Sequence, residues 1–500
     1  MAIQKKYILS IDQGTSSSRA LIFDHNTNIV GVAQKEFKQY YPNEGWVEHD
    51  ALEIWHTQKQ VIDDCISKSN IDIQEIAAIG ITNQRETTIV WDTETGNPVH
   101  HAIVWQDRRT ADECSKIKAT SFADKIANKT GLIVDAYFSA SKLKWLLDHV
   151  PGLREKANNG SVKFGTVDSW LIYKLTNGLC HYTDVTNASR TMLFNIHQLI
   201  WDQELLDYFD LPIQILPQVL PSNANYGFAT IGGHQIPIYG VAGDQQAALF
   251  GQNCLGQGAT KVTYGTGCFM MTNTGNQVVR SNNQLLSTIG WQLTGQPAVY
   301  AMEGSVFVGG AVISWLRDGL KIIGDSAGSE EKAASVKDSN GVVFVLALTG
   351  LGAPHWDQYA RGMIIGITRD TTDAHIIRAA LESIALQVND LITAMEQDLQ
   401  APIPSIKVDG GAIQNKLLLK MQAGISNKEI VVPKILESTA LGAALLAGLY
   451  CNFWSELEEI TSLWQTDQSV YPVNIQEYDT LKIQWRKAIE RSKNWIDQIS

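Results

Sequence analysis

The stretch from residue 10 to residue 19 reads SIDQGTSSSR and lies between two apolar runs, residues 7–9 and 20–23. Its glycine turn carries three hydroxyl side chains: Thr15, Ser16 and Ser17. Such a turn can aim hydroxyls and backbone N–H groups at one point, which suits phosphate oxygens. Asp12, at a strand end, can face a magnesium ion directly or through water, and Arg19 can add positive charge. The alternative is a polar hairpin loop without a ligand.

Two further glycine turns offer similar groups. Residues 264–267 read YGTG and include Thr266, and residues 408–415 read VDGGAIQN. The latter stretch follows a short predicted strand and precedes a predicted helix over 416–424, so its glycines would let a base or a ribose approach the backbone. Glycines kept for packing at a helix terminus are the alternative. Three such turns in one chain favour a nucleotide bound across a cleft.

Asp244 stands where an apolar strand pattern, residues 236–242, gives way to a helical pattern that begins at Gln245. A carboxylate at the carboxyl end of a strand points into the crevice where α/β proteins bind ligands. There it can act as a catalytic base. Aspartate is also a favoured N-cap residue, and the sequence leaves both interpretations open.

A charged pair and two aromatic residues are candidates for binding a small substrate. Arg85 and Glu86 lie between the runs AAIGI and TTIVWD, where a loop lets them converge and offer donors and acceptors to vicinal hydroxyls. Trp105 and Tyr137 can pack on a carbon skeleton. The alternatives are a solvated charged turn and ordinary core aromatic residues.

Other motifs and the charge balance exclude several classes of protein. Residues 324–328, GDSAG, match the hydrolase elbow G-x-S-x-G, but they follow a helical pattern, whereas the elbow needs a strand before it. The chain has no G-x-x-x-x-G-K, no G-x-G-x-x-G after a strand and no H-E-x-x-H, which removes support for P-loop ATPases, typical dinucleotide enzymes and zinc peptidases. The formal net charge of −12 argues against a nucleic-acid partner.

The elements that must position these residues alternate between strand and helix patterns, which is typical of α/β layers. Strand patterns include residues 77–82, 236–242, 341–348 and 406–408, and helical patterns include residues 51–67, 141–149 and 374–399. The apolar run 440–450 is too short to cross a membrane and suits a tightly packed internal helix. The six cysteines are far apart and the first residues lack the apolar core of a signal peptide, so we expect a cytoplasmic protein without a membrane span.

The two halves of the chain share a pattern. Strand, glycine turn and strand occur in order over residues 7–24 and again over 261–272. Two such modules facing each other would form two lobes with a cleft, and we expect these lobes to be residues 1–252 and 253–500. Gly-Thr turns are also common hairpin connections, so this pattern alone leaves a duplication open.

Together the three glycine turns resemble those of the superfamily of sugar kinases, actin and heat-shock chaperone ATPases. Residues 137–149, YFSASKLKWLLDH, and 362–382, GMIIGITRDTTDAHIIRAALE, resemble the FGGY carbohydrate kinases. Six shorter stretches, from GWVEHD at 45–50 to TGLGAPHWD at 349–357, are similar to the glycerol kinase branch of that family. The resemblance covers nearly the whole chain. It implies two actin-like or ribonuclease H-like lobes, each with a mixed central sheet flanked by helices, and a cleft between them.

The resemblance also implies an activity, namely Mg²⁺-assisted transfer of a phosphoryl group from ATP to glycerol, giving sn-glycerol 3-phosphate. It places glycerol against seven residues: Arg85, Glu86, Trp105, Tyr137, Asp244, Gln245 and Phe269. It places the nucleotide against nine residues: Thr15, Ser16, Ser17, Arg19, Thr266, Gly310, Ser314, Gly411 and Asn415. It assigns the metal ion to Asp12 and Asp244, the latter also as general base, and it implies a homodimer or homotetramer.

Two features depart from the family pattern. Ser314 stands where the family usually has Gln. The loop over residues 231–237, IGGHQIP, is shorter than the basic loop of relatives that fructose 1,6-bisphosphate inhibits, so we expect such inhibition to be weak or absent. One alternative function is that of another FGGY kinase, acting on a pentulose or a polyol. A non-catalytic ATP-binding protein, actin-like or chaperone-like, is a second alternative, but it leaves Arg85, Glu86 and Trp105 without a role.

Overall fold

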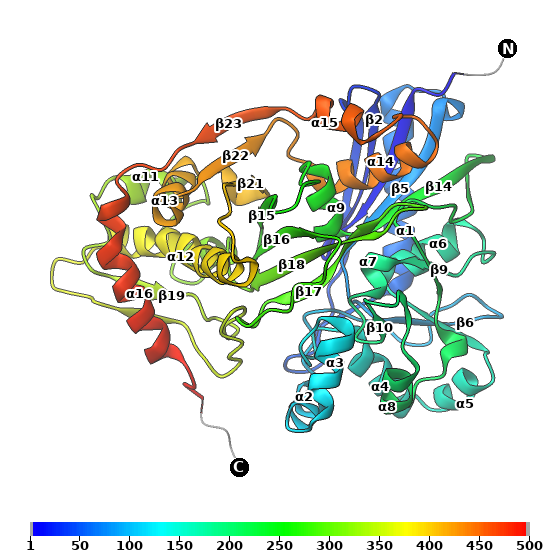
Figure 1. Ribbon diagram of the computed structural model, residues 1–500, viewed down its shortest axis with the longest axis horizontal. Coiled ribbons are helices and arrows are strands. Elements are labelled where there is room, and N and C mark those ends of the chain that lie inside the picture. Colours follow the sequence, from blue (N-terminus) through cyan, green and yellow to red (C-terminus); the bar gives the residue numbers. More distant parts are fainter. Residues whose placement is uncertain (1–3, 497–500) are drawn as a thin grey trace.

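Each half of the chain contributes one central β-sheet with helices on its faces (Figure 1). The computed structural model describes residues 4–496. The strands of the first sheet, in spatial order, are β13 (Phe228–Ile231), β14 (His234–Gly243), β5 (Ile76–Asn83), β1 (Tyr7–Gln13), β2 (Ser17–Asp24) and β3 (Ile29–Glu36). Those of the second sheet are β17 (Leu286–Gln292), β18 (Ala298–Val306), β16 (Cys268–Gly275), β15 (Thr260–Tyr264), β21 (Ser405–Asp409), β22 (Glu429–Pro433) and β23 (Thr466–Val470). The α/β fold with two sheet-containing lobes is therefore confirmed.

The two sheets share a core of five strands with the same order and the same directions. This core is β3-β2-β1-β5-β14 in the first sheet and β18-β16-β15-β21-β22 in the second. In each core the first three strands pair antiparallel, and the third pairs parallel with the fourth, as the fourth does with the fifth. β1 and β15 thus occupy equivalent positions, and a glycine turn follows each. The repeated pattern in the sequence corresponds to a repeated sheet topology.

The remaining elements cover these sheets or form the region below the first one. The helices are α1 (Ala51–Ser69), α2 (Ala111–Lys118), α3 (Phe122–Thr130), α4 (Ser139–His149), α5 (Leu153–Asn158), α6 (Val167–Leu175), α7 (Val185–Ala188), α8 (Gln203–Phe209), α9 (Asp244–Gly251), α10 (Ala311–Asp318), α11 (Gly328–Ala334), α12 (Asp373–Leu399), α13 (Lys416–Ser426), α14 (Ser438–Tyr450), α15 (Leu457–Leu463) and α16 (Asp479–Ser492). Short 3₁₀ turns are η1 (Ile73–Glu75), η2 (Ile213–Ile215), η3 (Gly411–Gln414) and η4 (Ile475–Tyr478). The short strands are β4 (Glu48–His49), β6 (Ile89–Asp92), β7 (Ala102–Ile103), β8 (Val162–Gly165), β9 (Tyr182–Asp184), β10 (Phe194–Asn195), β11 (Ile200–Trp201), β12 (Gln218–Leu220), β19 (Val343–Val345) and β20 (Met363–Ile365).

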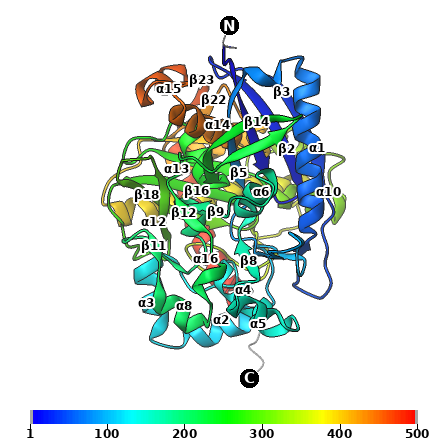
Figure 2. The ribbon, with the colours of Figure 1, turned by 90° about the vertical axis from the view of Figure 1, so that its right-hand side faces the viewer.

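Helices pack on both faces of the first sheet, which explains why its central strands are apolar runs. Successive side chains of a strand point to opposite faces. Leu9 and Ile11 of β1 belong to a buried cluster with residues of α1, whereas Ile8 belongs to a cluster with residues of α14. Figure 2 shows α1 along one side of the blue strands. A strand covered on both faces is apolar at almost every position.

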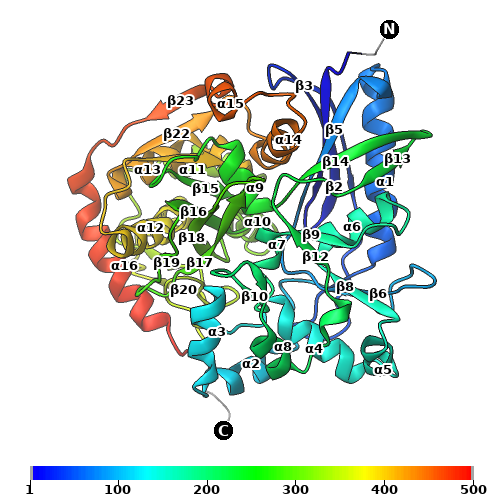
Figure 3. The same ribbon diagram turned by 45° about the vertical axis from the view of Figure 1, so that its right-hand side comes forward.

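Helix α14 lies in the second half of the chain but packs against the first sheet and against α9 (Figure 3). A Cβ atom added to Gly442 of α14 would lie 1.9 Å from the carbonyl oxygen of Ala247 in α9, and one added to Gly80 of β5 would lie 2.1 Å from that of Ala443. The run 440–450 is thus the tightly packed internal helix that its small residues predict. Among the described residues, no helix is long and apolar enough to cross a membrane.

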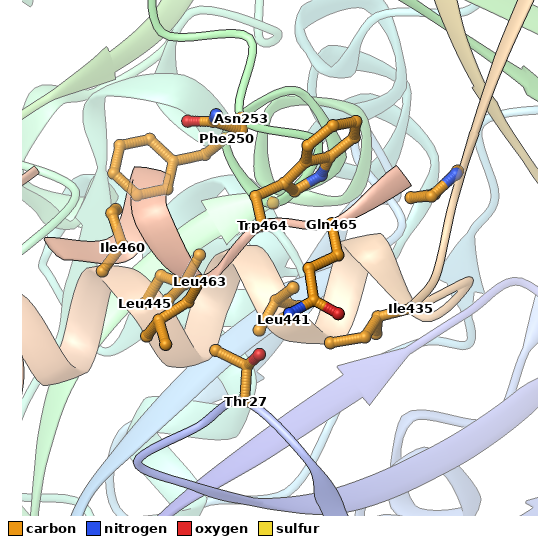
Figure 4. A pocket seen from close by; sticks show the side chains of 12 residues that line it. Thr27, Phe250, Asn253, Ile435, Leu441, Leu445, Ile460, Leu463, Trp464 and Gln465 are labelled. Carbon is orange, nitrogen blue, oxygen red and sulfur yellow. The ribbon is translucent and has the colours of Figure 1, made fainter. Parts of the chain in front are cut away.

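A small apolar cavity of about 20 Å³ lies beside this contact (Figure 4). Its lining includes Phe250 of α9, Leu445 of α14, Ile460 of α15 and Thr27 from the turn after β2. A space of this size holds one water molecule at most. The two halves therefore meet here through closely packed apolar side chains.

Candidate active site

A cavity of about 320 Å³ opens where β5 and β14 end, between the turn after β1 and the turn after β15. All seven residues that the sequence assigns to a substrate line it: Arg85, Glu86, Trp105, Tyr137, Asp244, Gln245 and Phe269. They come from distant segments and both halves of the chain. We call this space the acceptor cavity.

A larger cavity of about 710 Å³ lies in the second half, between α10, α12 and the turn after β21. Five residues assigned to the nucleotide line it: Thr266, Gly310, Ser314, Gly411 and Asn415. Its volume suits a nucleotide. Thr266 also lines the acceptor cavity, so the two cavities meet at the Gly-Thr-Gly turn.

The turn after β1 contacts the aromatic wall of the acceptor cavity. The backbone N–H of Gly14 donates to the carbonyl oxygen of Ser17 at 3.0 Å and closes the turn. The indole Nε1–H of Trp105 donates to Oγ1 of Thr15 at 3.0 Å. The Trp105 ring stands edge-on to Tyr137 and Phe269, with centroids 5.6 and 6.3 Å apart. One hydrogen bond thus connects the turn to an apolar surface that can cover a carbon chain.

The two glycines after β21, Gly410 and Gly411, are needed for different reasons. Gly410 has φ = 93°, and a Cβ atom there would lie 2.5 Å from the carbonyl oxygen of Tyr264, so only glycine fits. Gly411 has no atom within 4 Å of such a Cβ position and lines the larger cavity. Gly410 therefore shapes the turn, and Gly411 leaves space for a ligand.

Arg85 and Glu86 are buried and converge, so a solvated charged turn is the wrong interpretation. They are 3% and 1% exposed, and Glu86 has φ = 61°, which turns the chain after β5. Nη1 and Nη2 of Arg85 donate to Glu303, Gln246 and, at 3.4 Å, the hydroxyl of Tyr137. Nε lies 3.2 Å from Oδ1 of Asp244 and 3.7 Å from Oε1 of Glu86. Within residues 4–496 Nε makes no hydrogen bond, so it can still donate to a substrate.

Asp244 is the first residue of α9 rather than its N-cap, which is Gly243. The interpretation of Asp244 as a cap is therefore wrong. Its Oδ1 accepts the N–H of Gln245 at 2.7 Å and faces Nε of Arg85. Oδ2 makes no hydrogen bond to any described residue, and Asp244 lines the acceptor cavity. One oxygen is oriented by the protein while the other can take a proton.

Asp12 lies in β1 directly opposite Arg19 of β2 and is 8% exposed. Burial raises the pKa of Asp12 to about 7; Glu437 and Asp244 act in the same direction, and Arg19 acts against them. A cation would stabilise the charged form of this carboxyl. Within residues 4–496, no group of three or more His, Cys, Asp or Glu could hold a metal ion, but Mg²⁺ bound with a phosphate substrate needs only one or two carboxylates.

Three of the assigned residues line neither cavity: Asp12, Ser17 and Arg19. The guanidinium of Arg19 is paired with Glu437 at 2.6 Å, before α14, and lies 3.8 Å from Asp12. Oγ of Ser17 accepts a hydrogen bond from Gln34 at 3.1 Å. Thr15 and Ser16, in contrast, line the acceptor cavity. The contacts of Ser17 and Arg19 with phosphate stay predictions.

Sequence reasoning missed the buried polar groups behind the acceptor cavity. Glu303 of β18 and Arg190, which follows α7, are completely buried and contact Arg85 and Glu86. Lys261 of β15 is also buried and donates to Oε1 of Gln245. Glu303 and Lys261 carry no local motif that distinguishes them from core residues, whereas Arg190 lies in residues 186–196, one of the six stretches that resemble glycerol kinases.

The G-x-S-x-G stretch at 324–328 is not a hydrolase elbow. Residues 324–327 lie in the loop after α10, Gly328 begins α11, and no strand directly precedes the stretch. Ser326 lines the larger cavity. This agrees with the sequence-based exclusion of a hydrolase.

Comparison with known proteins places this architecture in a class. Two sheets with the same five-strand core, each followed by a glycine turn at one of two adjoining cavities, occur in kinases of small molecules and also in other ATP-binding proteins with two lobes. Residues 7–251 match the N-terminal domain of the FGGY family of carbohydrate kinases, and residues 260–451 match the C-terminal domain of that family. The chain belongs to the FGGY family of carbohydrate kinases.

Its relatives in that family are similar over their full length. A glycerol kinase of Parabacteroides distasonis is 55% identical over 99% of this chain and 100% of its own length. Glycerol kinase 2 of Thermotoga maritima is 54% identical over 98% of this chain and 99% of its own length. The crystal structure of Plasmodium falciparum glycerol kinase with ADP has a TM-score of 0.90 and 36% identity, covering 98% of this chain and 99% of that one. A xylulose kinase of Lactobacillus acidophilus, at 24% identity and a TM-score of 0.86 over 97% and 98%, shares the fold.

Proposed function

We propose that the protein is an ATP-dependent kinase of glycerol that forms sn-glycerol 3-phosphate in glycerol catabolism. The observation that carries the proposal is the acceptor cavity, in which donors, acceptors and an aromatic wall surround a space suited to a small polyhydroxy compound. The full-length similarity to glycerol kinases supports glycerol over other acceptors.

The buried groups of the acceptor cavity bind glycerol through its hydroxyls. Nε of Arg85 donates, the carboxylates of Glu86 and Asp244 accept, and Trp105 and Phe269 cover the carbon chain. Glycerol is uncharged, so these hydrogen bonds supply the recognition. An analogue that lacks a hydroxyl leaves a buried polar group unpaired, and the site therefore rejects it.

Asp244 acts as the general base. As the terminal hydroxyl attacks the γ-phosphoryl group in line, Oδ2 of Asp244 accepts the hydroxyl proton and the bond from γ-phosphorus to ADP breaks. Oδ1 stays oriented by the N–H of Gln245 and by Arg85. A fixed base beside a fixed hydroxyl turns the transfer into an intramolecular step.

The donor side consists of the larger cavity and the two glycine turns. The base and ribose of ATP lie along Gly310, Ser314, Gly411 and Asn415, and the phosphates reach Thr266. Thr15, Ser16, Ser17 and Arg19 complete the phosphate site from the first lobe. Carboxylate oxygens of Asp12 and Asp244 would hold Mg²⁺, which supplies charge stabilisation at the phosphate oxygens.

An acceptor panel tests the proposal. Purified protein receives ATP and Mg²⁺ with glycerol, dihydroxyacetone, xylulose, ribulose or no acceptor, and ADP release and product are measured. Glycerol-dependent ADP release with glycerol 3-phosphate supports the proposal. Turnover with a pentulose alone would show another FGGY kinase, and ATP hydrolysis indifferent to every acceptor would show an actin-like or chaperone-like ATPase.

Three further features belong to this proposal. The lobes are residues 1–252 and 253–500, with the boundary between the end of α9 at Gly251 and the start of β15 at Thr260. The protein forms a homodimer or homotetramer, which sedimentation would test. It works in the cytoplasm, where ATP is available and where its six free cysteines remain reduced.

A further inference from the structure

A closed ring of four buried charges lies behind the acceptor cavity. Its members are Arg85, Glu303, Arg190 and Glu86, each at most 3% exposed. The formal charges sum to zero, with two guanidinium groups and two carboxylates. Such a ring is stable in a dry interior only when every member is paired, because an unpaired buried charge is costly.

Glu303 accepts three of the four hydrogen bonds within the ring. Its Oε2 accepts from Nη1 of Arg85 at 2.6 Å, and its Oε1 accepts from Nη2 of Arg85 at 2.8 Å. This two-pronged pairing fixes the plane of the guanidinium group. Oε1 also accepts from Nη2 of Arg190 at 3.1 Å. Arg190 in turn donates from Nε to Oε1 of Glu86 at 2.6 Å.

The ring joins the two lobes. Glu303 lies in β18 of the second sheet, whereas Arg85 and Glu86 follow β5 of the first sheet. Burial alone would raise the pKa of Glu303, but Arg190 and Arg85 lower it to about 2. Glu303 therefore stays charged at every working pH. It does not line the acceptor cavity, so it acts on substrate only through its partners.

We infer that Glu303 is a positioning residue for the acceptor site, which holds Arg85 directly and Glu86 through Arg190. With both Nη atoms occupied by the interior, Arg85 turns Nε toward the cavity, Asp244 and the substrate. One carboxylate from the second lobe thus aligns the donor and an acceptor for glycerol in the first lobe. This inference rests on the proposed function.

The experiment compares Glu303→Gln and Glu303→Asp with the wild-type enzyme. The amide of Gln places N–H groups against two guanidinium groups, whereas Asp keeps the charge at a shorter reach. We expect Glu303→Gln to raise the KM for glycerol at least about 30-fold and to leave the Kd for ADP within about twofold. Glu303→Asp should recover part of the loss. If Glu303→Gln does not fold, Glu303→Asp still tests the inference, because its shorter reach should raise the KM for glycerol while the Kd for ADP stays unchanged.

Selectivity provides a readout that a merely structural role would not change. The ratio of kcat/KM for glycerol to that for propane-1,2-diol should fall at least about tenfold in Glu303→Gln, because misaligned groups no longer reject the analogue. Glu382→Gln is the matched control: Glu382 is 3% exposed, pairs with Arg378 at 2.9 Å and lies in the same lobe. It should lower thermal stability while the KM for glycerol stays within about twofold.

Two outcomes would overturn the positioning role of Glu303, and a third would overturn the proposed function. A Glu303→Gln enzyme with wild-type KM and selectivity overturns the positioning role. A parallel loss of glycerol and ADP binding, matched by Glu382→Gln, also overturns it, since the effect would then be general destabilisation. A wild-type enzyme that ignores glycerol overturns the proposed function itself, which separates that failure from the failure of Glu303.

Discussion

The contact between α14 and α9 sets the position of Asp244, the proposed base, and Gly442→Ala tests this. The new Cβ atom would lie 1.9 Å from the carbonyl oxygen of Ala247, whereas ordinary contacts begin near 3.4 Å. The two helices must therefore separate by about 1.5 Å. Ala247 lies one turn along α9 from Asp244, so the base moves with its helix.

Two effects of opposite sign act on stability in this variant. Alanine is favoured over glycine inside a helix by about 1 kcal/mol. Overpacking a close contact costs about 1–3 kcal/mol, so we expect a net loss in the free energy of unfolding. A displacement of about 1 Å at a reacting group can cost about 10²-fold in rate, and we expect kcat/KM for glycerol to fall by that factor.

The assay is steady-state kinetics with glycerol, together with ADP binding and thermal unfolding of the same samples. Gly256→Ala is the matched control, because a Cβ atom there has no atom within 4 Å and the residue has no positive φ. It should keep wild-type kinetics. If Gly442→Ala folds and turns over glycerol like the wild type, the helix contact does not position the base.

Four shorter predictions follow from individual contacts. Asp244→Asn should lower kcat at least about 10²-fold with unchanged ADP binding, and near-normal turnover would exclude Asp244 as the base. Thr15→Val removes the hydrogen-bond acceptor for Trp105 and should raise the KM for glycerol about fivefold in the same assay. An unchanged KM would show that this hydrogen bond does not contribute to glycerol binding. Burial, with the charge of His101, lowers the pKa of His49 to about 3. Below about pH 6.5 the unfolded chain therefore takes up a proton at this histidine that the folded chain does not, and the free energy of unfolding should fall by about 1.4 kcal/mol per pH unit. Urea titrations at several pH values should show that His49→Gln loses this pH dependence. Fructose 1,6-bisphosphate should leave the rate unchanged in the glycerol assay, because the two-glycine turn between β13 and β14 has no lysine or arginine to bind phosphates.

The acceptor cavity could be predicted from the sequence because many of its residues lie at strand ends or in glycine turns, which sequence patterns can locate. Asp244 and Arg85 follow apolar strands, and strand ends of an α/β sheet face the ligand crevice. Thr15 and Thr266 stand in glycine turns after equivalent strands. The family resemblance then indicates which of these residues belong to one site.

The remaining features depend on contacts between distant segments. Glu303 lies inside a strand and looks like any core position until the lobes meet. The pairing of Arg19 with Glu437 arises only because α14 returns to the first sheet. The apolar run 341–348 predicts one strand, but only Val343–Val345 form a strand, because the partner strand Met363–Ile365 is no longer than that.

The two sheets have the same core topology, but the charged residues of the buried ring are divided unequally between the two lobes. Each lobe presents a glycine turn after an equivalent strand, so phosphate can be held from both sides of the cleft. Most of the seven candidate substrate residues belong to the first half of the chain, where Arg85 and Arg190 carry the two positive charges of the ring and Glu86 carries one negative charge. Glu303 of the second lobe restores neutrality. Without Glu303, both Nη atoms of Arg85 and Nη2 of Arg190 would lose their carboxylate partner, so the ring of charges is complete only when both sheets are packed together.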